Sequence, residues 1–414
     1  MEKVFVVLAD TEKKEEEEKE FLELVKACDF NVDMIFSQHI KNITFKTYIG
    51  SGKCAEIQEH LQDKEITYIL FNQDLSPLQI RNLETIWKIP VMDRSELILA
   101  IFSRRAKSPA AKLQIESAQL KKMLPRLIGS NTQLSRQGGS GLNKGSGEKQ
   151  LEIDRRRIKS RISEVEKELK KLKGQRMIQR KAREKNELPL VALVGYTNAG
   201  KSTIMNQILN YVGGKNEKQV LEENMLFATL DTSVRHIPLP NGHSFLLSDT
   251  VGFISHLPHE LIKAFHSTLE EVCYADILLQ VVDASSQEHQ NHMQVTMDTL
   301  RQIEAANIPM ITIFNKCDNT QYIHPQIHQN LIYLCAKDKT DIEELIQMIS
   351  SFLFHEKKVH MFIPYSQYSI YSYLKEHSHI IKEKQEEEGI SIYLYLNNRL
   401  YNKYKDFIQD VILE

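Results

Sequence analysis

The chain has 414 residues, of which 26% are charged and 42% are hydrophobic, enough for about two to four domains with cores of their own. No run approaches the roughly 18 apolar residues that a membrane-spanning helix requires, and the first ten residues lack a signal-peptide pattern. The five cysteines are scattered without a CxxC pair, which argues against a structural zinc site or a disulfide framework. We therefore expect a cytoplasmic protein without a membrane span.

The net charge of −2 conceals a strong asymmetry. Residues 104–185 carry 24 Lys/Arg against 8 Asp/Glu, whereas the remainder carries 29 basic and 47 acidic residues. One segment with a net charge of +16 therefore lies within an otherwise acidic protein. Such a block predicts a polyanionic partner, either nucleic acid or an anionic membrane surface.

Residues 1–107 alternate short apolar runs with polar helical stretches, which predicts a small α/β domain with a mostly parallel sheet. The acidic run at residues 11–20 is most simply a solvated helix face. The expected strands are residues 4–9, 32–37, 68–72 and 89–93, and the expected helices include residues 15–27 and 53–62.

Residues 108–187 predict a basic helical hairpin. Two apolar seams recur at steps of three and four residues, which is typical of one helix face. Between them, residues 138–147 include five glycines, so a loop is expected at the tip. Pro125 lies inside the first seam and should kink or end that helix. The seams are Leu113, Ser117, Leu120, Leu124 and Leu127 in the first helix, and Ile158, Ile162, Val165, Leu169 and Leu172 in the second.

Residues 188–356 alternate strands and helices again and predict a second, doubly wound α/β domain. Residues 357–414 predict a small α+β domain with strands at 359–365 and 390–396 and a final helix at 405–413. The strands expected in the larger domain are residues 189–196, 244–249, 276–283, 308–315 and 331–335.

A phosphate-binding loop is predicted where an apolar strand meets a helix. The segment fits GxxxxGK[ST] at every fixed position. Its glycines let backbone N–H groups surround phosphates, Lys201 can reach the β- and γ-phosphates, and the Ser202 hydroxyl can bind Mg²⁺. The segment comprises Gly195, Tyr196, Thr197, Asn198, Ala199, Gly200, Lys201 and Ser202.

An NKxD motif at a strand end predicts that the base is guanine. One carboxylate, Asp318, can accept hydrogen bonds from the adjacent N1–H and N2–H₂ donors of guanine, whereas adenine would leave that carboxylate unpaired. A CAK segment at the end of the next strand supports this interpretation. The predicted base-binding residues are Asn315, Lys316, Cys317, Asp318, Cys335, Ala336 and Lys337.

Two further segments are expected to sense the γ-phosphate. Asp249 would hold Mg²⁺ directly or through water, and the Gly252 N–H can meet the γ-phosphate. Thr229 is the expected second hydroxyl ligand of Mg²⁺, with Thr232 as the alternative, and it can bind only while the γ-phosphate holds its loop closed. The two segments are Phe227, Ala228, Thr229, Leu230 and Asp231, and Asp249, Thr250, Val251 and Gly252.

The residue after Gly252 is Phe253, which cannot orient an attacking water as a glutamine would. Intrinsic GTP hydrolysis is therefore expected to be slow unless a partner orders the site.

The basic cluster that opens the second hairpin helix has two interpretations. It is a solvated helix face, or it contacts nucleic-acid phosphates, which the local charge of +16 favours. No aromatic motif for reading single-stranded bases is present. The cluster comprises Arg155, Arg156, Arg157, Lys159 and Arg161.

Together these motifs resemble the HflX family of ribosome-associated GTPases, and the likeness spans nearly the whole chain. The segments GYTNAGKST, FATLD, DTVGFISHLPH and NKCD are similar to its nucleotide motifs. The segments DRSELILAIFSRRA, KLQIESAQL, LPRL, LSRQGG and GEKQLEIDRRRIKSRI are similar to the N-terminal and helical regions that separate this family from other GTPases.

The resemblance implies a factor that binds GTP and GDP with Mg²⁺, whose helical arm enters the large (50S) ribosomal subunit near the peptidyl-transferase centre. It implies splitting of stalled 70S ribosomes, stimulation of GTPase activity by the large subunit, and a monomer. At the arm's tip, rRNA contacts are expected from Arg136, Leu142, Asn143 and Lys144.

The tip segment GGSGLNKGSGE departs from the usual GGGIGTRGPGE. This departure favours an alternative, in which the chain belongs to a resistance-type branch that displaces large-subunit antibiotics or is a GTP-gated ribosome-binding module that hydrolysis only resets. The sequence leaves the use of ATP open. A P-loop kinase or helicase is disfavoured by NKxD and DTVG.

Overall fold

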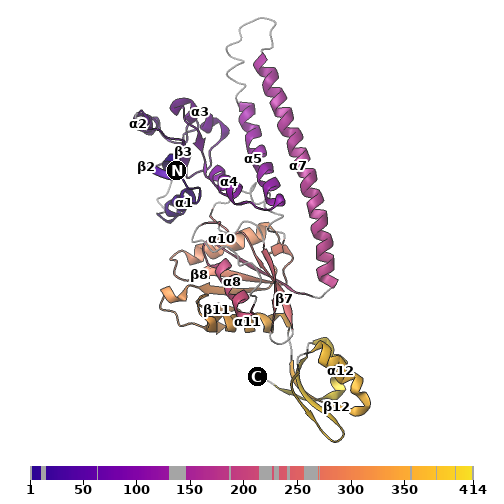
Figure 1. Cartoon of the computed structure of the whole chain (residues 1–414). Helices are drawn as coiled ribbons and strands as arrows, with labels where there is room; N and C mark the ends of the chain where they lie inside the picture. Colours follow the sequence, from indigo (N-terminus) through magenta and orange to yellow (C-terminus); the bar gives the residue numbers. More distant parts are fainter. Residues whose placement is uncertain are drawn as a thin grey trace.

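The computed structural model contains three β-sheets in the part of the chain that it describes, and a long helical hairpin projects from them (Figure 1). The α/β class expected from the sequence is confirmed. The described residues are 2–10, 15–62, 64–129, 146–185, 188–213, 226–227, 233–239, 243–255, 269, 271–354, 357–378, 380–396 and 398–412.

The N-terminal sheet is parallel, with strand order β2-β1-β3-β4. Its strand β1 is apolar along nearly its whole length and is buried on both faces, as is usual for parallel strands covered by helices. Capping by Ser76 starts α3, and Asp93 caps α4 by accepting from the Glu96 N–H. The elements are β1 Lys3–Asp10, α1 Glu15–Ala27, β2 Asn31–His39, α2 Ser51–Leu61, β3 Tyr68–Phe71, α3 Pro77–Trp87, β4 Val91–Met92 and α4 Arg94–Arg105.

The hairpin consists of α5 Pro109–Gly129 and the 40-residue α7 Ser146–Lys185, which lie side by side. At 1.5 Å per residue, α7 is about 60 Å long. Val165 of the predicted second seam is fully buried, and the other members of that seam are half-buried. Of the two outcomes predicted for Pro125, a kink or the end of the helix, the second is wrong, because α5 continues to Gly129.

Two ion pairs join the two hairpin helices. The Arg161 guanidinium donates to both carboxylate oxygens of Glu116, at 2.6 and 3.1 Å, and Lys121 pairs with Glu166 at 2.8 Å. Some of the arm's charge therefore holds the hairpin together.

The central sheet has the order β10-β11-β9-β8-β5-β7-β6, parallel except at its two edges, where β10 and β6 run antiparallel to their neighbours. The sequence did not predict these edge strands. The carboxyl ends of β5, β7, β8 and β9 meet at one edge, which is where ligands bind in such sheets. The elements are β5 Leu190–Gly195, α8 Lys201–Tyr211, β6 Ser233–Pro238, β7 Ser244–Asp249, β8 Ile277–Asp283, α10 His289–Gln302, β9 Met310–Asn315, η1 Cys317–Asn319, β10 Gln326–His328, β11 Leu331–Tyr333 and α11 Lys339–Phe354.

The C-terminal sheet is antiparallel, with order β13-β14-β12-β15. The prediction of a final helix at 405–413 is wrong: a short 3₁₀ turn leads into β15, which pairs with the edge of β12, where Val359 lies opposite Val411. The elements are β12 Lys357–Pro364, η2 Tyr365–Gln367, α12 Tyr368–His377, β13 Ile380–Gln385, β14 Gly389–Leu396, α13 Asn398–Lys403, η3 Lys405–Phe407 and β15 Ile408–Ile412.

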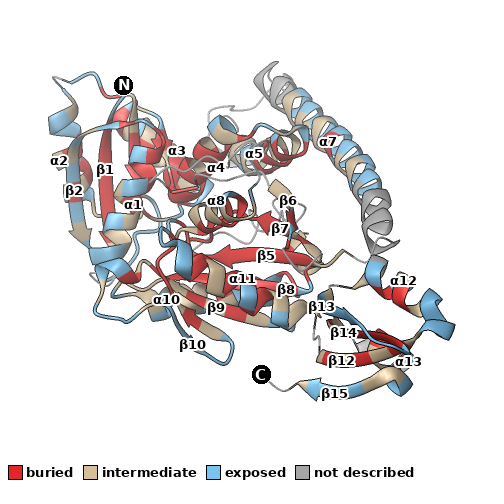
Figure 2. Cartoon of the chain, turned by 60° about the horizontal axis from the view of Figure 1, so that its bottom comes forward, coloured by how far each residue is buried: buried red, intermediate tan, exposed pale blue. Residues whose placement is uncertain are grey.

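Buried residues are continuous from the N-terminal sheet to the central one (Figure 2). One hydrophobic cluster combines residues of β1, α1, α4 and α5 with Leu226, Phe227, Val251 and Ile254. The last four lie close to the predicted nucleotide site, so that site and the N-terminal sheet share a core. Among the described helices, none is both long and apolar enough to cross a membrane.

Candidate nucleotide-binding site

The predicted phosphate-binding loop joins β5 to α8 in a conformation that only glycine permits at two points. Gly195 has φ +140° and Gly200 has φ +98°. A Cβ atom at Gly195 would overlap the Val281 carbonyl, and one at Gly200 would overlap the Asn315 amide. The loop therefore delivers its N–H groups and the start of α8 to the carboxyl edge of the sheet, the arrangement that binds phosphate.

Lys201 folds back over this loop. Its Nζ donates to the carbonyls of Gly195 at 3.0 Å and Tyr196 at 2.7 Å, and the side chain is only 6% exposed. Burial lowers its pKa to about 8, against an opposing effect of the Asp249 carboxylate. The ammonium is thus held at the position where a phosphate would meet it.

Ser202, one of the two predicted Mg²⁺ ligands, lies beside Asp249. The Ser202 hydroxyl donates to Asp249 Oδ2 at 2.8 Å, and Asp249 is fully buried at the end of β7. A hydroxyl and a carboxylate oxygen fit Mg²⁺, which prefers hard oxygen ligands, and P-loop GTPases generally use this ion. When bound, Mg²⁺ neutralises charge that develops between the phosphates.

The segment after Asp249 passes directly beneath the phosphate-binding loop. The Thr250 hydroxyl donates to the Leu193 carbonyl at 2.6 Å. A Cβ at Gly252 would lie 2.7 Å from Thr197 Cγ2 and 3.0 Å from Lys201 Nζ, so only glycine fits there. Val251 is buried. The Gly252 amide is therefore close to the ammonium that would meet a γ-phosphate.

Phe253 is 2% exposed and packs in the core beside β5 and β8. Its backbone exchanges hydrogen bonds with the phosphate-binding loop: its N–H donates to the Gly195 carbonyl at 3.1 Å, and its carbonyl accepts from the Thr197 N–H at 2.8 Å. The side chain is therefore part of this core.

Of the other predicted γ-phosphate segment, the structure describes Phe227, which is buried. Ala228, Thr229, Leu230 and Asp231, and hence the predicted second Mg²⁺ ligand, lie outside the described residues.

The predicted base-binding residues converge through one amide side chain. Asn315 Nδ2 donates to the Ala199 carbonyl at 2.9 Å, and its Oδ1 accepts from the Ala336 N–H at 3.0 Å. This buried side chain therefore joins the phosphate-binding loop, the NKxD segment and the CAK segment. Asp318 and Lys337 are exposed at the rim, whereas Cys317 and Cys335 are buried, and burial raises the pKa of both thiols.

Two carboxylates that support this site were not predicted. Asp283, at the end of β8, pairs with Lys316 at 2.7 Å. Asp341, at the start of α11, is 1% exposed and accepts from the Cys335 N–H at 2.6 Å and contacts His324 Nδ1 at 2.7 Å. The position of Asp283 at the end of a strand could have identified it from the sequence. Asp341 could not be identified in this way, because its partners are a backbone N–H and a histidine outside any motif.

The predicted rRNA contacts are less completely placed. Arg156 and Arg157 have side chains that are 78% and 74% exposed, and Lys159 is exposed. Arg155 is half-buried, and Arg161 is engaged with Glu116. Arg136, Leu142, Asn143 and Lys144 lie outside the described residues.

A glycine-shaped phosphate loop, a hydroxyl–carboxylate pair suited to Mg²⁺, and base-recognition segments joined to the loop by Asn315 define the protein as a P-loop GTPase, an enzyme that hydrolyses GTP to GDP and phosphate. Comparison with known proteins agrees. Residues 15–103 match a family described as GTP-binding GTPase N-terminal, 105–183 the GTP-binding GTPase middle region, and 190–316 the 50S ribosome-binding GTPases.

The chain is similar over nearly its whole length to proteins named GTPase HflX. It is 39% identical to that of Caldanaerobacter subterraneus subsp. tengcongensis, covering 98% of this chain and 93% of the relative. It is 38% identical to that of Lacrimispora saccharolytica, covering 94% and 91%, and 37% identical to that of Escherichia coli, covering 93% and 91%. The chain belongs to the HflX GTPase family.

Asp318 of the NKxD segment makes a prediction about nucleotide-base specificity. Asp318→Asn replaces a double acceptor with a group that presents an N–H₂ donor, so affinity for GTP should fall about 10- to 100-fold. Affinity for xanthosine triphosphate, which has a carbonyl where guanine has its amino group, should rise. Competition binding with fluorescent GDP measures both, with Asp406→Asn in the C-terminal sheet region as control. An unchanged preference for GTP over xanthosine triphosphate would show that Asp318 does not read the base.

The lowered pKa of Lys201 makes a prediction about pH. Phosphate binds the protonated ammonium, so above about pH 8 the free protein must take up a proton to bind GTP. Affinity should therefore fall about tenfold between pH 7 and pH 9. Lys201→Arg, whose guanidinium stays charged, should show a flat profile over that range in isothermal titration calorimetry. Parallel slopes for the two proteins would exclude Lys201 as the titrating group.

Proposed function

We propose that this GTPase binds the large ribosomal subunit and dissociates stalled 70S ribosomes, with the α5–α7 hairpin contacting ribosomal RNA. The observation that carries the proposal is the hairpin itself: a net charge of +16 is concentrated on residues 104–185, and a helix about 60 Å long carries it away from the GTPase sheet (Figure 1). An arm of this length and charge suits a narrow, RNA-lined site. The 50S ribosome-binding GTPases matched by residues 190–316 support the same partner.

The exposed cations of α7 are suited to phosphate contacts. Among the described residues, Arg156 and Arg157 pair locally with acidic residues on the same helix, at 3.1 and 3.6 Å, and exposed pairs of this kind contribute little energy. They can therefore exchange those partners for phosphates at small cost. Arg161, by contrast, keeps the hairpin together through Glu116, and it would contribute to binding by holding the arm rigid.

The GTPase site supports a switch that a partner completes. Lys201 and the start of α8 hold the phosphates, Ser202 and Asp249 hold Mg²⁺, and the Asn315 network holds the base-recognition segments together. Because Phe253 is buried in the core, its side chain does not activate water. We infer that binding to the ribosome orders the hydrolytic site and that hydrolysis is slow without the ribosome. We also infer that the factor acts as a cytoplasmic monomer.

One observation favours a second candidate of a different class. The hairpin tip carries Leu142, Asn143 and Lys144 where the family usually has GTR. A tip changed in this way suits a protein that protects the large subunit from antibiotics, in which occupancy of the site matters and hydrolysis only resets the protein. Protection from drug by a Lys201→Ala variant without subunit separation would favour this candidate.

Stimulation of GTP turnover by purified 50S subunits tests the proposal. We expect at least a tenfold increase, with a ribosome affinity that falls steeply between 50 and 200 mM salt as phosphate contacts are screened. Arg156→Glu with Arg157→Glu should weaken 50S binding at least tenfold and leave turnover without ribosomes unchanged.

The matched control is Lys382→Glu with Lys405→Glu, which makes the same change of charge on the C-terminal sheet region, where both lysines are exposed. Equal losses in the two double variants, or turnover that 50S subunits do not alter, would contradict the proposed role of the hairpin.

A further inference from the structure

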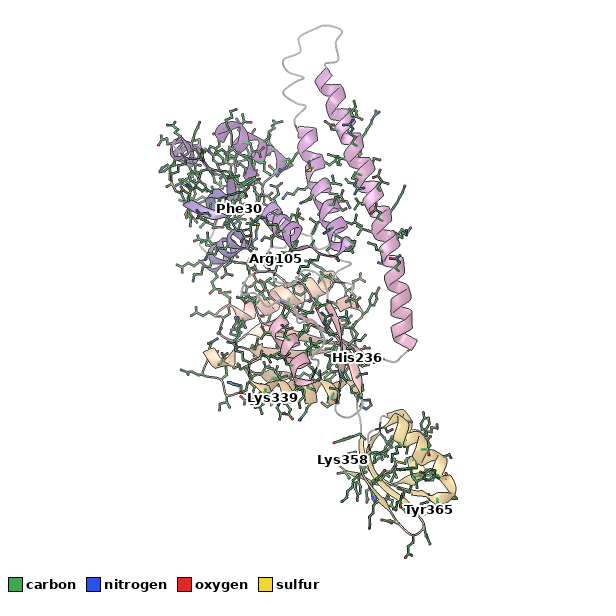
Figure 3. The ribbon with its side chains drawn as sticks, in the orientation of Figure 1. Phe30, Arg105, His236, Lys339, Lys358 and Tyr365 are labelled. Carbon is green, nitrogen blue, oxygen red and sulfur yellow. The ribbon has the colours of Figure 1, made fainter. Side chains whose placement is uncertain are left out.

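Three side chains with metal-binding atoms converge beside the guanine-recognition segments. His324 lies between η1 and β10, and Asp338 and Asp341 lie at the start of α11. Each offers one ring nitrogen or carboxylate oxygen, and these three atoms all lie within 4.8 Å of one another. Figure 3 labels Lys339, the first residue of α11, on the side of the central sheet away from the hairpin tip. We call His324, Asp338 and Asp341 the His–Asp cluster.

Asp341 is the buried member of the His–Asp cluster, and its carboxylate is incompletely hydrogen-bonded. The side chain is 1% exposed. Its Oδ2 accepts from the Cys335 N–H at 2.6 Å and contacts His324 Nδ1 at 2.7 Å, whereas its Oδ1 has no hydrogen-bond partner among the described residues. Because a buried charge is costly unless it is paired or coordinates a metal, a cation held by this carboxylate would supply the partner that Oδ1 lacks.

The other two members of the cluster are open to solvent. The His324 side chain is 25% exposed, and Asp338 is exposed. Asp338 Oδ1 accepts from the Thr340 N–H at 2.9 Å, but an ionised carboxylate has about four acceptor sites, so this bond leaves room for an ion. Lys339, between the two aspartates, places its ammonium 6.0 Å from the ring centroid of Tyr211. An ion can therefore enter from solvent and reach a buried carboxylate.

The combination of one imidazole and two carboxylates selects the class of ion. Mg²⁺ and Ca²⁺ prefer ligand sets made of oxygen alone. Zn²⁺ binds histidine nitrogen at about 2.0–2.1 Å and carboxylate oxygen at about 2.0–2.2 Å, and three protein ligands leave its fourth position to water. Ligand atoms within 4.8 Å of one another can close on such an ion by side-chain rotation. The donor set therefore suits Zn²⁺ better than the ion that serves the phosphates.

The His–Asp cluster is hydrogen-bonded directly to the CAK segment. Asp341 accepts from the Cys335 N–H, and the Asp338 N–H donates to the Cys335 carbonyl at 2.9 Å. The next residue, Ala336, donates its N–H to Asn315 Oδ1 at 3.0 Å. An ion that fixes both aspartates would therefore also fix the segment that is expected to meet the guanine base.

We propose that the His–Asp cluster binds one divalent cation of the Zn²⁺ class, and that the bound ion stabilises the CAK segment in its guanine-binding position. By thermodynamic linkage, the ion raises the affinity for GDP, and GDP raises the affinity for the ion by the same factor. The ribosome has no part in this site, so failure of 50S subunits to stimulate turnover would affect only the proposed function.

Calorimetric titration of Zn²⁺ into the full chain, loaded with GDP and excess Mg²⁺, tests the site. We expect one ion to bind with an affinity that falls about tenfold or more in His324→Asn and in Asp338→Asn. Asparagine is as good a helix cap as aspartate, so Asp338→Asn removes a ligand charge and keeps the start of α11. His328→Asn is the matched control, because His328 is exposed on the adjoining strand β10, and it should bind Zn²⁺ like wild type.

Two further measurements locate the ion and test its effect. Anomalous X-ray scattering from crystals soaked in Zn²⁺ should give a peak between His324, Asp338 and Asp341. Zn²⁺ should also raise the affinity for GDP about fivefold or more in wild type and leave it unchanged in His324→Asn, which keeps Ser202 and Asp249 and so corrects for Zn²⁺ bound at the phosphates.

Three results would overturn the proposal. Equal Zn²⁺ affinity in wild type and both cluster variants would show that the three side chains form only a hydrogen-bonded group. A scattering peak confined to cysteines or to the phosphate site would exclude the cluster as the ligand set. An affinity for GDP that Zn²⁺ changes equally in wild type and His324→Asn would remove the coupling to the guanine side of the site.

Discussion

The path of the backbone from β5 into α8 is the constraint on which the rest of the structure depends. Gly195 and Gly200 adopt positive φ angles against Val281 and Asn315, and any side chain at either point would push the loop off its neighbours. The loop can therefore approach both the next strand and the NKxD segment. That approach buries Lys201 and brings Ser202 to Asp249. The phosphate-binding loop, the Ser202–Asp249 pair and the Asn315 network therefore all depend on one tight turn.

The same turn also connects the central sheet to the N-terminal region. Tyr196 occupies a position of the phosphate loop whose side chain is free to point away from the nucleotide, and it points into the interface with α1 and α4. The segment after Gly252 pairs with the loop through Phe253 and with the N-terminal region through Ser255. The phosphate-binding loop, the segment after Gly252 and the N-terminal region are thereby joined in one hydrogen-bond network.

Local patterns predicted much of this fold. Apolar runs such as that of β5 located the strands of both parallel sheets, because strands buried on two faces are apolar throughout. The nucleotide motifs were visible because phosphate chemistry requires fixed spacing over a few residues. The prediction of a helix at residues 405–413 was wrong for a physical reason. Ile408, Val411 and Ile412 suit either a helix face or a strand, and only pairing with β12 decides between them. The edge strand β10 has three residues, and half of the residues of β6 are polar, so neither carries a strong signal.

Contacts between distant segments were beyond sequence reasoning. Glu20 belongs to an acidic run that most simply indicates a solvated helix, yet its side chain is buried against Arg94 and Tyr196. Asp341 likewise holds the CAK segment by accepting a hydrogen bond from the Cys335 N–H, a contact that leaves no sequence motif. Such residues are identified by what lies beside them in space, and one sequence does not contain that information.

Sedimentation of 70S ribosomes through a sucrose gradient tests the central claim, that GTP at the nucleotide site controls the binding of the basic hairpin to ribosomal RNA. With a non-hydrolysable GTP analogue, the protein should convert 70S particles to subunits and migrate with the 50S peak, whereas with GDP the 70S peak should persist and the protein should remain at the top. Identical profiles with the two nucleotides would contradict the account.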